Sequence, residues 1–246
     1  MKHLLSTALI AVCLSVGITT ASAQTAPVTN TPTTDTPAAA VTDKQKATLE
    51  KHLKPILTAL ALGDAAKEAT VSNAFATFST GQSAWHQAND AKLKTLWNQF
   101  NKARSKQNNQ AADQALADID AIYATCQPQH QQFLADLGTV LTPAQVETVE
   151  DVLTVNKVKV TYNVYLQIFP SLTEAQKAVV LKDLKAAREQ AIDAGSMAEK
   201  SAFFKKYKIQ IEDDYLTAQG YNPKQARKDF ANKAKTDAPK KADDAN

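Results

Sequence analysis

Signals for helix starts recur along this chain and constrain its fold more than any other feature. Five residue pairs have the capping-box spacing: Thr42/Gln45, Thr142/Gln145, Thr173/Gln176, Ser196/Glu199 and Asn222/Gln225. In such a box the first side chain accepts from an N–H of the first helical turn, and the second reaches back to the cap. The chain has only six glycines, and after Gly17 all but Gly81 fall where a helical pattern stops. This is typical of glycines that end helices in a left-handed conformation.

The spacing of apolar residues favours the same fold. Val180, Leu184, Ala187 and Ala191 step by four, three and four residues, as on one face of a helix. One strand-like alternation, residues 155–160, is too short to make a sheet and is interpreted as an extended connector. We therefore predict an all-α, antiparallel, bundle-like domain with no sheet. The expected helices span residues 43–62, 64–106, 109–138 with a break near Pro128, 143–154, 161–169, 173–194, 197–219 and 223–234.

The N-terminus has the three parts of a secretory signal peptide. Lys2 precedes an apolar run that ends at Ile18, and Ala21-Ser22-Ala23 forms a cleavage site. The run is shorter than the ~20 residues of a membrane span, so we expect cleavage and an exported bacterial protein, periplasmic or secreted. The expected plan is a signal peptide (1–23), a disordered Thr/Pro/Ala tether (24–42), a helical domain (43–233) and a disordered polar tail (234–246).

Charge and cysteine content argue against several classes of partner. The chain carries 28 basic and 25 acidic residues, and this near-balance favours neither nucleic acid nor an anionic membrane. No segment after the signal peptide reaches the length of a membrane span. Cys126 is the only cysteine after Cys13, so the exported chain has no internal disulfide. A bridge between chains stays open for Cys126, although a small buried side chain is the preferred interpretation; the oligomeric state is not predicted.

No pattern of residues forms a catalytic or cofactor signature. The chain lacks a G-x-S-x-G elbow, a glycine-rich phosphate loop and an H-E-x-x-H helix, so no catalytic residue and no cofactor is predicted. Cys126 and His130 have the spacing of half a zinc site, but Pro128 lies between them and no second pair of ligands is visible. We predict no metal site and a structural or surface role for both residues.

Two short motifs resemble those of a chaperone family. The sequences LTPAQ at 141–145 and LTEAQ at 172–176 are similar to the LTxxQ motifs of Spy/CpxP-like periplasmic chaperones. This resemblance implies a helical chaperone or interaction protein of the cell envelope. A capping box explains the threonine and the glutamine of each motif equally well.

A broader resemblance covers most of the chain. The segments LGDAAKEATV, LTPAQVETV, VTYNVYLQIFPSLTEAQK, AAREQAIDAGSMAEK, FFKKYK and YLTAQGYN resemble, in their order and spacing, an exported bacterial family catalogued as domain of unknown function 3826. That family is loosely labelled as sugar-binding. The resemblance implies a helical exported protein and no established catalytic residues.

Three function hypotheses follow. The first, implied chiefly by the family resemblance, is a non-enzymatic carbohydrate-binding protein. In such a site a sugar pairs its apolar C–H faces with aromatic rings and its hydroxyls with fixed polar groups. The alternative is an LTxxQ-type chaperone or cell-envelope interaction protein. The third is an unrecognised hydrolase, whose carboxylates would converge in a cleft.

The expected ligand-binding residues are polar or aromatic positions, most of them in the segments that carry the resemblance. They are Trp85, Tyr162, Arg188, Asp193 and Tyr221. Arg188 and Asp193 project about 140° apart on one helix, so Arg188 is preferred over Asp193 for a narrow pocket. The alternative for both is a solvated helix face, on which Glu189 and Asp193 form a like-charge pair.

Overall fold

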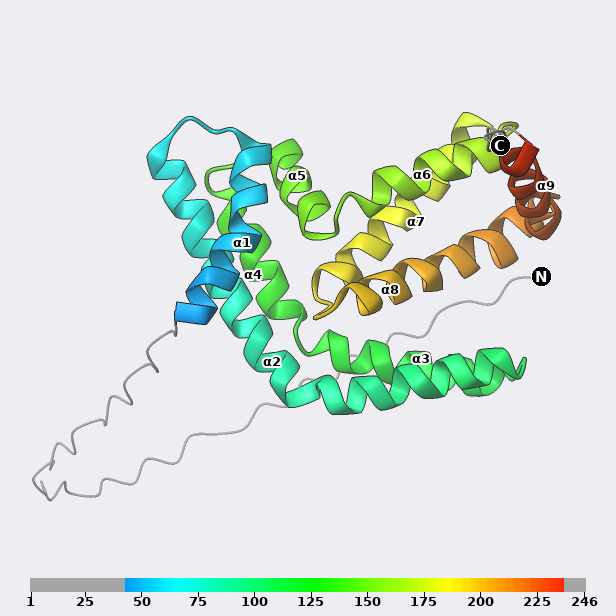
Figure 1. The fold of residues 1–246 in the computed structure, drawn as a ribbon, viewed down its shortest axis with the longest axis horizontal. Helices are drawn as coiled ribbons and strands as arrows, with labels where there is room; N and C mark the ends of the chain where they lie inside the picture. Colours follow the sequence, from blue (N-terminus) through cyan, green and yellow to red (C-terminus); the bar gives the residue numbers. More distant parts are fainter. Residues whose placement is uncertain (1–42, 237–246) are drawn as a thin grey trace, which may run out of the picture. The chain divides into compact units, whose positions relative to one another are not determined.

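The computed structural model describes residues 43–236, and within this range every regular element is a helix, which confirms the predicted fold class. The signal peptide, the tether and residues 237–246 of the tail lie outside the described residues. Figure 1 shows the arrangement. The elements are α1 (Asp43–Leu60), α2 (Ala65–Ser105), α3 (Asn109–Ala124), α4 (Gln127–Gly138), α5 (Pro143–Leu153), α6 (Lys157–Ile168), α7 (Glu174–Ile192), α8 (Met197–Ile209), the π-helix η1 (Gln210–Leu216) and α9 (Pro223–Thr236).

Two of the predicted capping boxes form in full and start α5 and α7. Thr142 N–H donates to Gln145 Oε1 at 3.0 Å, and Gln145 N–H donates to Thr142 Oγ1 at 3.3 Å. Thr173 and Gln176 make the same reciprocal pair. Ser196 caps α8 through the N–H of Glu199, but its hydroxyl, not its backbone, meets the Glu199 carboxylate. The two LTxxQ motifs therefore act locally as helix starts.

The expectation of an extended connector at 155–160 is wrong. The chain reverses at Val155 and Asn156, which have left-handed φ values of +50° and +56°, and α6 begins at Lys157. Val158, Tyr165 and Ile168 are buried at helical spacing. The valine–lysine alternation misled the prediction because β-propensity is easily overridden by packing.

Of the glycines, Gly63 and Gly220 have positive φ as expected, whereas Gly138 and Gly195 do not.

The long helix α2 changes direction part-way along its length. Figure 1 shows its first part beside α4 and its later part beside α3. Gly81 lies between these parts, and a Cβ there would lie only 2.0 Å from the Gln129 amide nitrogen. Because glycine leaves this space, Gln129 of α4 reaches in and donates to the Phe78 carbonyl at 2.9 Å. A side chain that enters the backbone ladder at a glycine is a recognised cause of helix bending.

The buried side chains form two hydrophobic clusters. One joins α1, the first part of α2, α4 and α5, and it contains the stacked rings of Phe78 and Phe133, 4.3 Å apart. The other, larger cluster joins the later part of α2 to α3, α6, α7, α8 and η1. Ile192 belongs to the first cluster and Ala194 to the second. The end of α7 therefore marks the boundary between the two clusters.

Sequence reasoning predicted a single helix over residues 197–219, but η1 interrupts it. Within η1, Glu212 is buried and its carboxylate accepts from Tyr165 Oη at 2.7 Å and from Arg227 Nε at 2.6 Å. Arg227 belongs to α9, and its guanidinium also lies over the Tyr165 ring. The π-helix thus turns Glu212 inward, where it holds α9 against α6.

Candidate functional site

Asp193 is the centre of a buried polar cluster at the boundary between the two hydrophobic clusters. Its side chain is 1% exposed and accepts from Gln127 Nε2 at 3.1 Å and from Gln82 Nε2 at 3.3 Å. His130 Nδ1 lies 3.0 Å from the same carboxylate. These partners come from α2 and α4, so Asp193 joins the end of α7 to both helices. A buried carboxylate is tolerated only when it is paired in this way.

His130 of this cluster lies next to negative charge. Burial alone would lower its pKa, but the hydrogen bond to Asp193 and the charges of Asp193 and Glu189 outweigh it, so the pKa is raised above its ordinary value. Its neighbour Cys126 is buried and donates its thiol hydrogen to the Tyr123 carbonyl at 3.0 Å. Burial raises the pKa of this thiol to about 12. In residues 43–236 no three His, Cys, Asp or Glu side chains are grouped as a metal site requires.

His86 connects the buried cluster to the surface. Its Nε2 lies 2.7 Å from the Asp193 carbonyl oxygen, and its Nδ1 lies 2.7 Å from Asp90 Oδ1. The carboxylate of Asp90 and the carbonyl of Asp193 are both hydrogen-bond acceptors. Gly195 packs against this ring, and a Cβ there would lie 2.7 Å from Nδ1. The contacts therefore fix the loop between α7 and α8 over His86.

Arg188 is buried and forms an ionic cluster with α5. Its guanidinium donates to Glu150 at 2.6 Å, to Asp151 at 2.8 Å and to Glu147 at 3.3 Å. Burial, reinforced by the charge of Glu189, raises the pKa of Glu150 to about 7, although Arg188 opposes the rise. The interpretation of Arg188 and Asp193 as a solvated face is wrong, because both are buried with specific partners.

The five residues expected from the sequence do not surround one cavity. Trp85 donates from its indole to Thr125 Oγ1 at 2.8 Å, while Tyr162 packs half-buried against the larger cluster. The Tyr221 hydroxyl contacts Ser171 and Gln176 at the start of α7. Arg188 and Asp193 lie on the same helical segment, but they point to α5 and to α4 respectively.

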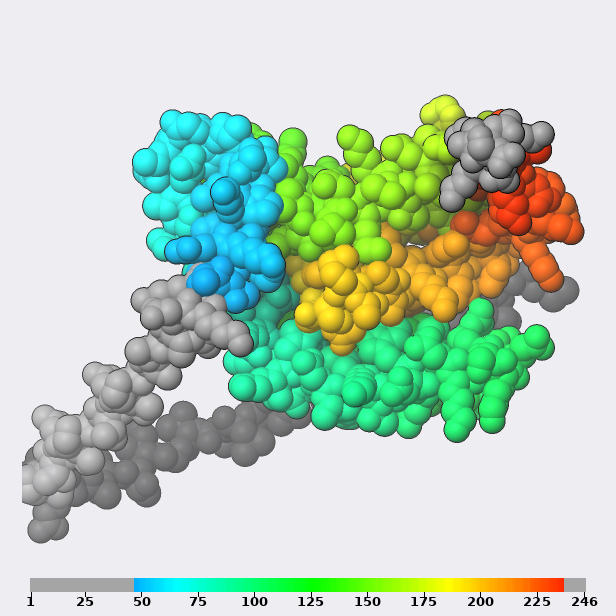
Figure 2. Space-filling model, viewed as in Figure 1, coloured from blue at the N-terminus to red at the C-terminus, as the bar shows by residue number. Residues whose placement is uncertain are grey.

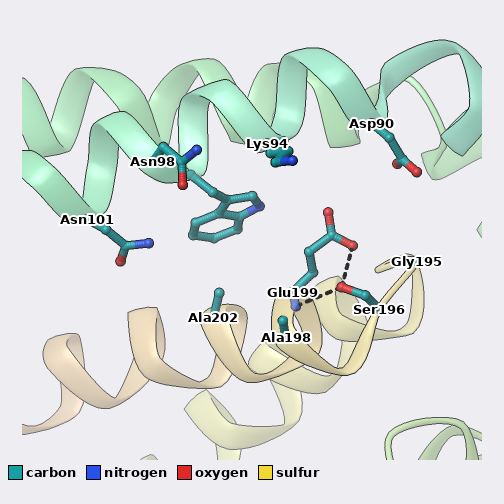
Figure 3. A pocket seen from close by; sticks show the side chains of 10 residues that line it. Asp90, Lys94, Asn98, Asn101, Gly195, Ser196, Ala198, Glu199 and Ala202 are labelled. Atoms are coloured by element: carbon teal, nitrogen blue, oxygen red, sulfur yellow. Dashed lines mark hydrogen bonds between the residues drawn. The ribbon is translucent and has the colours of Figure 1, made fainter.

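A different set of residues lines a pocket of 370 Å³ between α2 and the start of α8. Figure 3 shows the polar side chains of α2 opposite the turn that opens α8. The lining residues are Asp90, Lys94, Trp97, Asn98, Asn101, Gly195, Ser196, Ala198, Glu199 and Ala202. The first five stand at positions i, i+4, i+7, i+8 and i+11, so they form one stripe along α2. That polar stripe around a tryptophan was the sequence signal that could have located the pocket.

The ring of Trp97 is the aromatic wall of this pocket. Edge contacts with Phe100 at 5.8 Å and Phe203 at 5.5 Å hold it in place. Its buried indole N–H has no hydrogen-bond partner in the described chain, although such groups usually find one. The side chains of Lys94, Asn98 and Asn101 beside it are exposed and make no hydrogen bond or ion pair within residues 43–236. The pocket therefore offers an apolar ring next to hydrogen-bonding groups that have no internal partner.

Fold and site together define an all-helical protein with a buried polar cluster around Asp193, an ionic cluster around Arg188 and a polar pocket with Trp97 as its aromatic wall. A sequence model described as "Protein of unknown function (DUF3826)" matches residues 45–236, and the chain belongs to this family. The match confirms the family resemblance, whereas nothing in it supports the similarity to LTxxQ chaperones. No curated protein matches the chain. In residues 43–236 no helix combines the length and the apolar character needed to cross a membrane.

Proposed function

We propose that this protein is an exported, non-enzymatic carbohydrate-binding protein and that the pocket between α2 and α8 holds the sugar. The observation that carries the proposal is the Trp97 ring beside Lys94, Asn98 and Asn101, which have no internal partners. The C–H face of a sugar packs on an aromatic ring, and its hydroxyls need both donors and acceptors at fixed positions. The two amides supply both, and the lysine adds a charged donor.

The acidic side chains of the pocket fit the same ligand class. Asp90 and Glu199 approach from opposite walls, and each can accept a charge-assisted hydrogen bond from a sugar hydroxyl. Asp90 is held by His86, and Glu199 accepts from the Ser196 hydroxyl at 3.1 Å. Two carboxylates across a pocket are also the feature on which the hydrolase hypothesis rests. Turnover of a bound glycoside would favour that hypothesis over simple binding.

Tryptophan fluorescence gives a direct test, because the chain has only two tryptophans. In a Trp85→Phe variant, Trp97 is the sole tryptophan, and a glycan panel titrated into this protein should change its emission. Asn98→Ala and Asn101→Ala should each weaken binding about tenfold or more, since one lost hydrogen bond costs ~1–3 kcal/mol. Asn163→Ala, an exposed asparagine of α6 outside the pocket, is the matched control. A panel without any response, or equal loss in all three variants, would refute the sugar site.

Export is the second part of the proposal, and it rests on the signal-peptide pattern of residues 1–23. Protein taken from the cell envelope should begin at Gln24. Intact-mass measurement tests this, and a species that retains Met1 or starts at Cys13 would contradict it.

A further inference from the structure

A second pocket, of 330 Å³, lies on the other side of the α7–α8 loop. Four segments far apart in the sequence supply its walls: α1, the first part of α2, the end of α5 with the turn after it, and the start of α8. Figure 2 shows three of them bordering one another on one face, with α1 in blue, the green segment that includes α5, and the gold start of α8. The lining residues are Lys51, His52, Pro55, Phe75, Phe78, Ser79, Gln82, Val152, Leu153, Val155, Ala194, Met197 and Lys200.

The apolar part of this lining includes large side chains that are exposed to solvent. The structure has three large exposed hydrophobic side chains in its described range, and two of them, Val155 at 52% and Met197 at 50%, lie on this rim. Phe75 and Phe78 are buried beneath them. Apolar surface that gathers in a concavity typically marks a binding site, whereas single exposed residues do not.

The rim also contains a strained residue. Val155 has φ of +50°, a left-handed conformation that is a genuine outlier for a β-branched side chain. A glycine or asparagine would hold this turn with less strain. Strained positions of this kind concentrate at ligand sites, where the side chain is needed in that place. The turn thus presents a valine to the pocket at a cost in backbone energy.

The charge of this pocket has one sign. Its titratable lining side chains are Lys51, His52 and Lys200, and all three are bases. Lys200 is the innermost, because its ammonium donates to the carbonyls of Ala191 at 2.9 Å and Ile192 at 3.4 Å. An ammonium group has three hydrogens, so one remains for a ligand. Burial lowers the pKa of Lys200 to about 8, although the charges of Asp193 and Glu199 oppose this decrease. A bound anion would offset the loss of solvation at the ammonium.

We propose that this pocket binds a small monocarboxylate with an apolar body, of the medium-chain fatty-acid type. The carboxylate contacts Lys200 with Lys51 or His52, and the chain lies over Phe75 and Phe78 beneath Val155 and Met197. A neutral apolar molecule offers no charge partner to Lys51, His52 and the remaining hydrogen of Lys200, and a phosphate or sugar leaves the exposed apolar rim uncovered. This site is separate from the α2–α8 pocket and does not depend on the proposed sugar binding.

Calorimetric titration with octanoate and with its neutral analogue octanamide tests the charge requirement. Octanoate should bind at least tenfold more tightly than octanamide. Met197→Glu places a negative charge on the rim and should weaken octanoate at least tenfold. Met197 is the first residue of α8, where an acidic side chain is compatible with the helix, so this variant should fold. Val160→Glu, at a side chain that is 59% exposed on α6, is the matched control and should bind as the parent protein does.

The contrary results are equally clear. Octanamide binding as tightly as octanoate would show that the bases take no part in binding. Equal affinities of the two variants for octanoate would show that the rim takes no part. No octanoate binding to the parent protein would overturn the proposal as a whole. Asn98→Ala, in the other pocket, should leave octanoate binding unchanged, which keeps this test independent of the sugar hypothesis.

Discussion

Replacing Arg188 by methionine tests the ionic cluster between α7 and α5. The change keeps a long apolar side chain and removes the guanidinium that donates to Glu150, Asp151 and Glu147. Glu150 is almost as buried as Arg188, so its carboxylate would lose its partner without gaining water. Breaking a buried pair by removing one member costs ~3–5 kcal/mol. For a domain of this size, such a loss lowers Tm by roughly 10 °C.

Lys185→Met is the control, because Lys185 and Arg188 both contact the Glu147 carboxylate. Lys185 contacts Glu147 at 2.5 Å, but both side chains are about 40% exposed. Exposed pairs contribute ~0–1 kcal/mol, so Lys185→Met should cost less than 1 kcal/mol. Urea unfolding at pH 8 measures both variants. A loss below ~1 kcal/mol for Arg188→Met would refute the view that this cluster holds α7 to α5.

The pH dependence of the Arg188→Met deficit gives a second check. The pKa of Glu150 is already raised, to about 7. The stability that this raised pKa contributes is therefore fully present below the pKa of Glu150 in the unfolded chain, and it is lost as pH rises through about 7. Without Arg188, which lowers that pKa, the pKa of Glu150 rises further. Each added unit is about 1.4 kcal/mol. The deficit should therefore be larger at pH 8 than at pH 5, and a deficit that grows on acidification would contradict the assignment.

Two further predictions concern the loop and the cysteine. Gly195→Ala should cost ~1–3 kcal/mol, because its Cβ would meet the His86 ring, which two contacts hold in place. Gly138→Ala, where a Cβ meets nothing within 4 Å, should be neutral or slightly stabilising in thermal unfolding. Cys126→Ser should cost only ~1 kcal/mol, since it buries a hydroxyl, and EDTA should leave Tm unchanged. A large drop with EDTA would indicate a metal.

Local sequence signals were enough to predict the fold class. The capping pairs at Thr142 and Thr173 act over three residues, so their structure does not depend on the rest of the chain. The apolar stripe from Val180 to Ala191 is fully buried, as its spacing predicted. The π-helix and the start of α6 were missed because each depends on distant partners, Glu212 on Arg227 and Tyr165, and Val158 on its packing against the larger cluster.

The candidate site was harder to predict, because charge type in a sequence does not reveal burial. Arg188 and Glu189 are adjacent, yet one is buried and the other is not. The burial of Asp193 was missed because nothing in the sequence places His130, 63 residues away, beside it. The polar stripe around Trp97 was visible, but without its partner helix α8 it has the same pattern as an ordinary exposed face.

The first turn of α8 forms a wall of both pockets. Ser196 and Glu199 line the one beside Trp97, while Met197 and Lys200 line the basic one. A ligand that moves this turn on one side changes the opposite wall, and the effect of each ligand on the affinity of the other must then be equal in size. The turn is held by Ser196 at its cap and by Lys200 at the carbonyls of α7. The two proposed ligands, a sugar and a carboxylate, thus share the five-residue stretch 196–200 as a common wall.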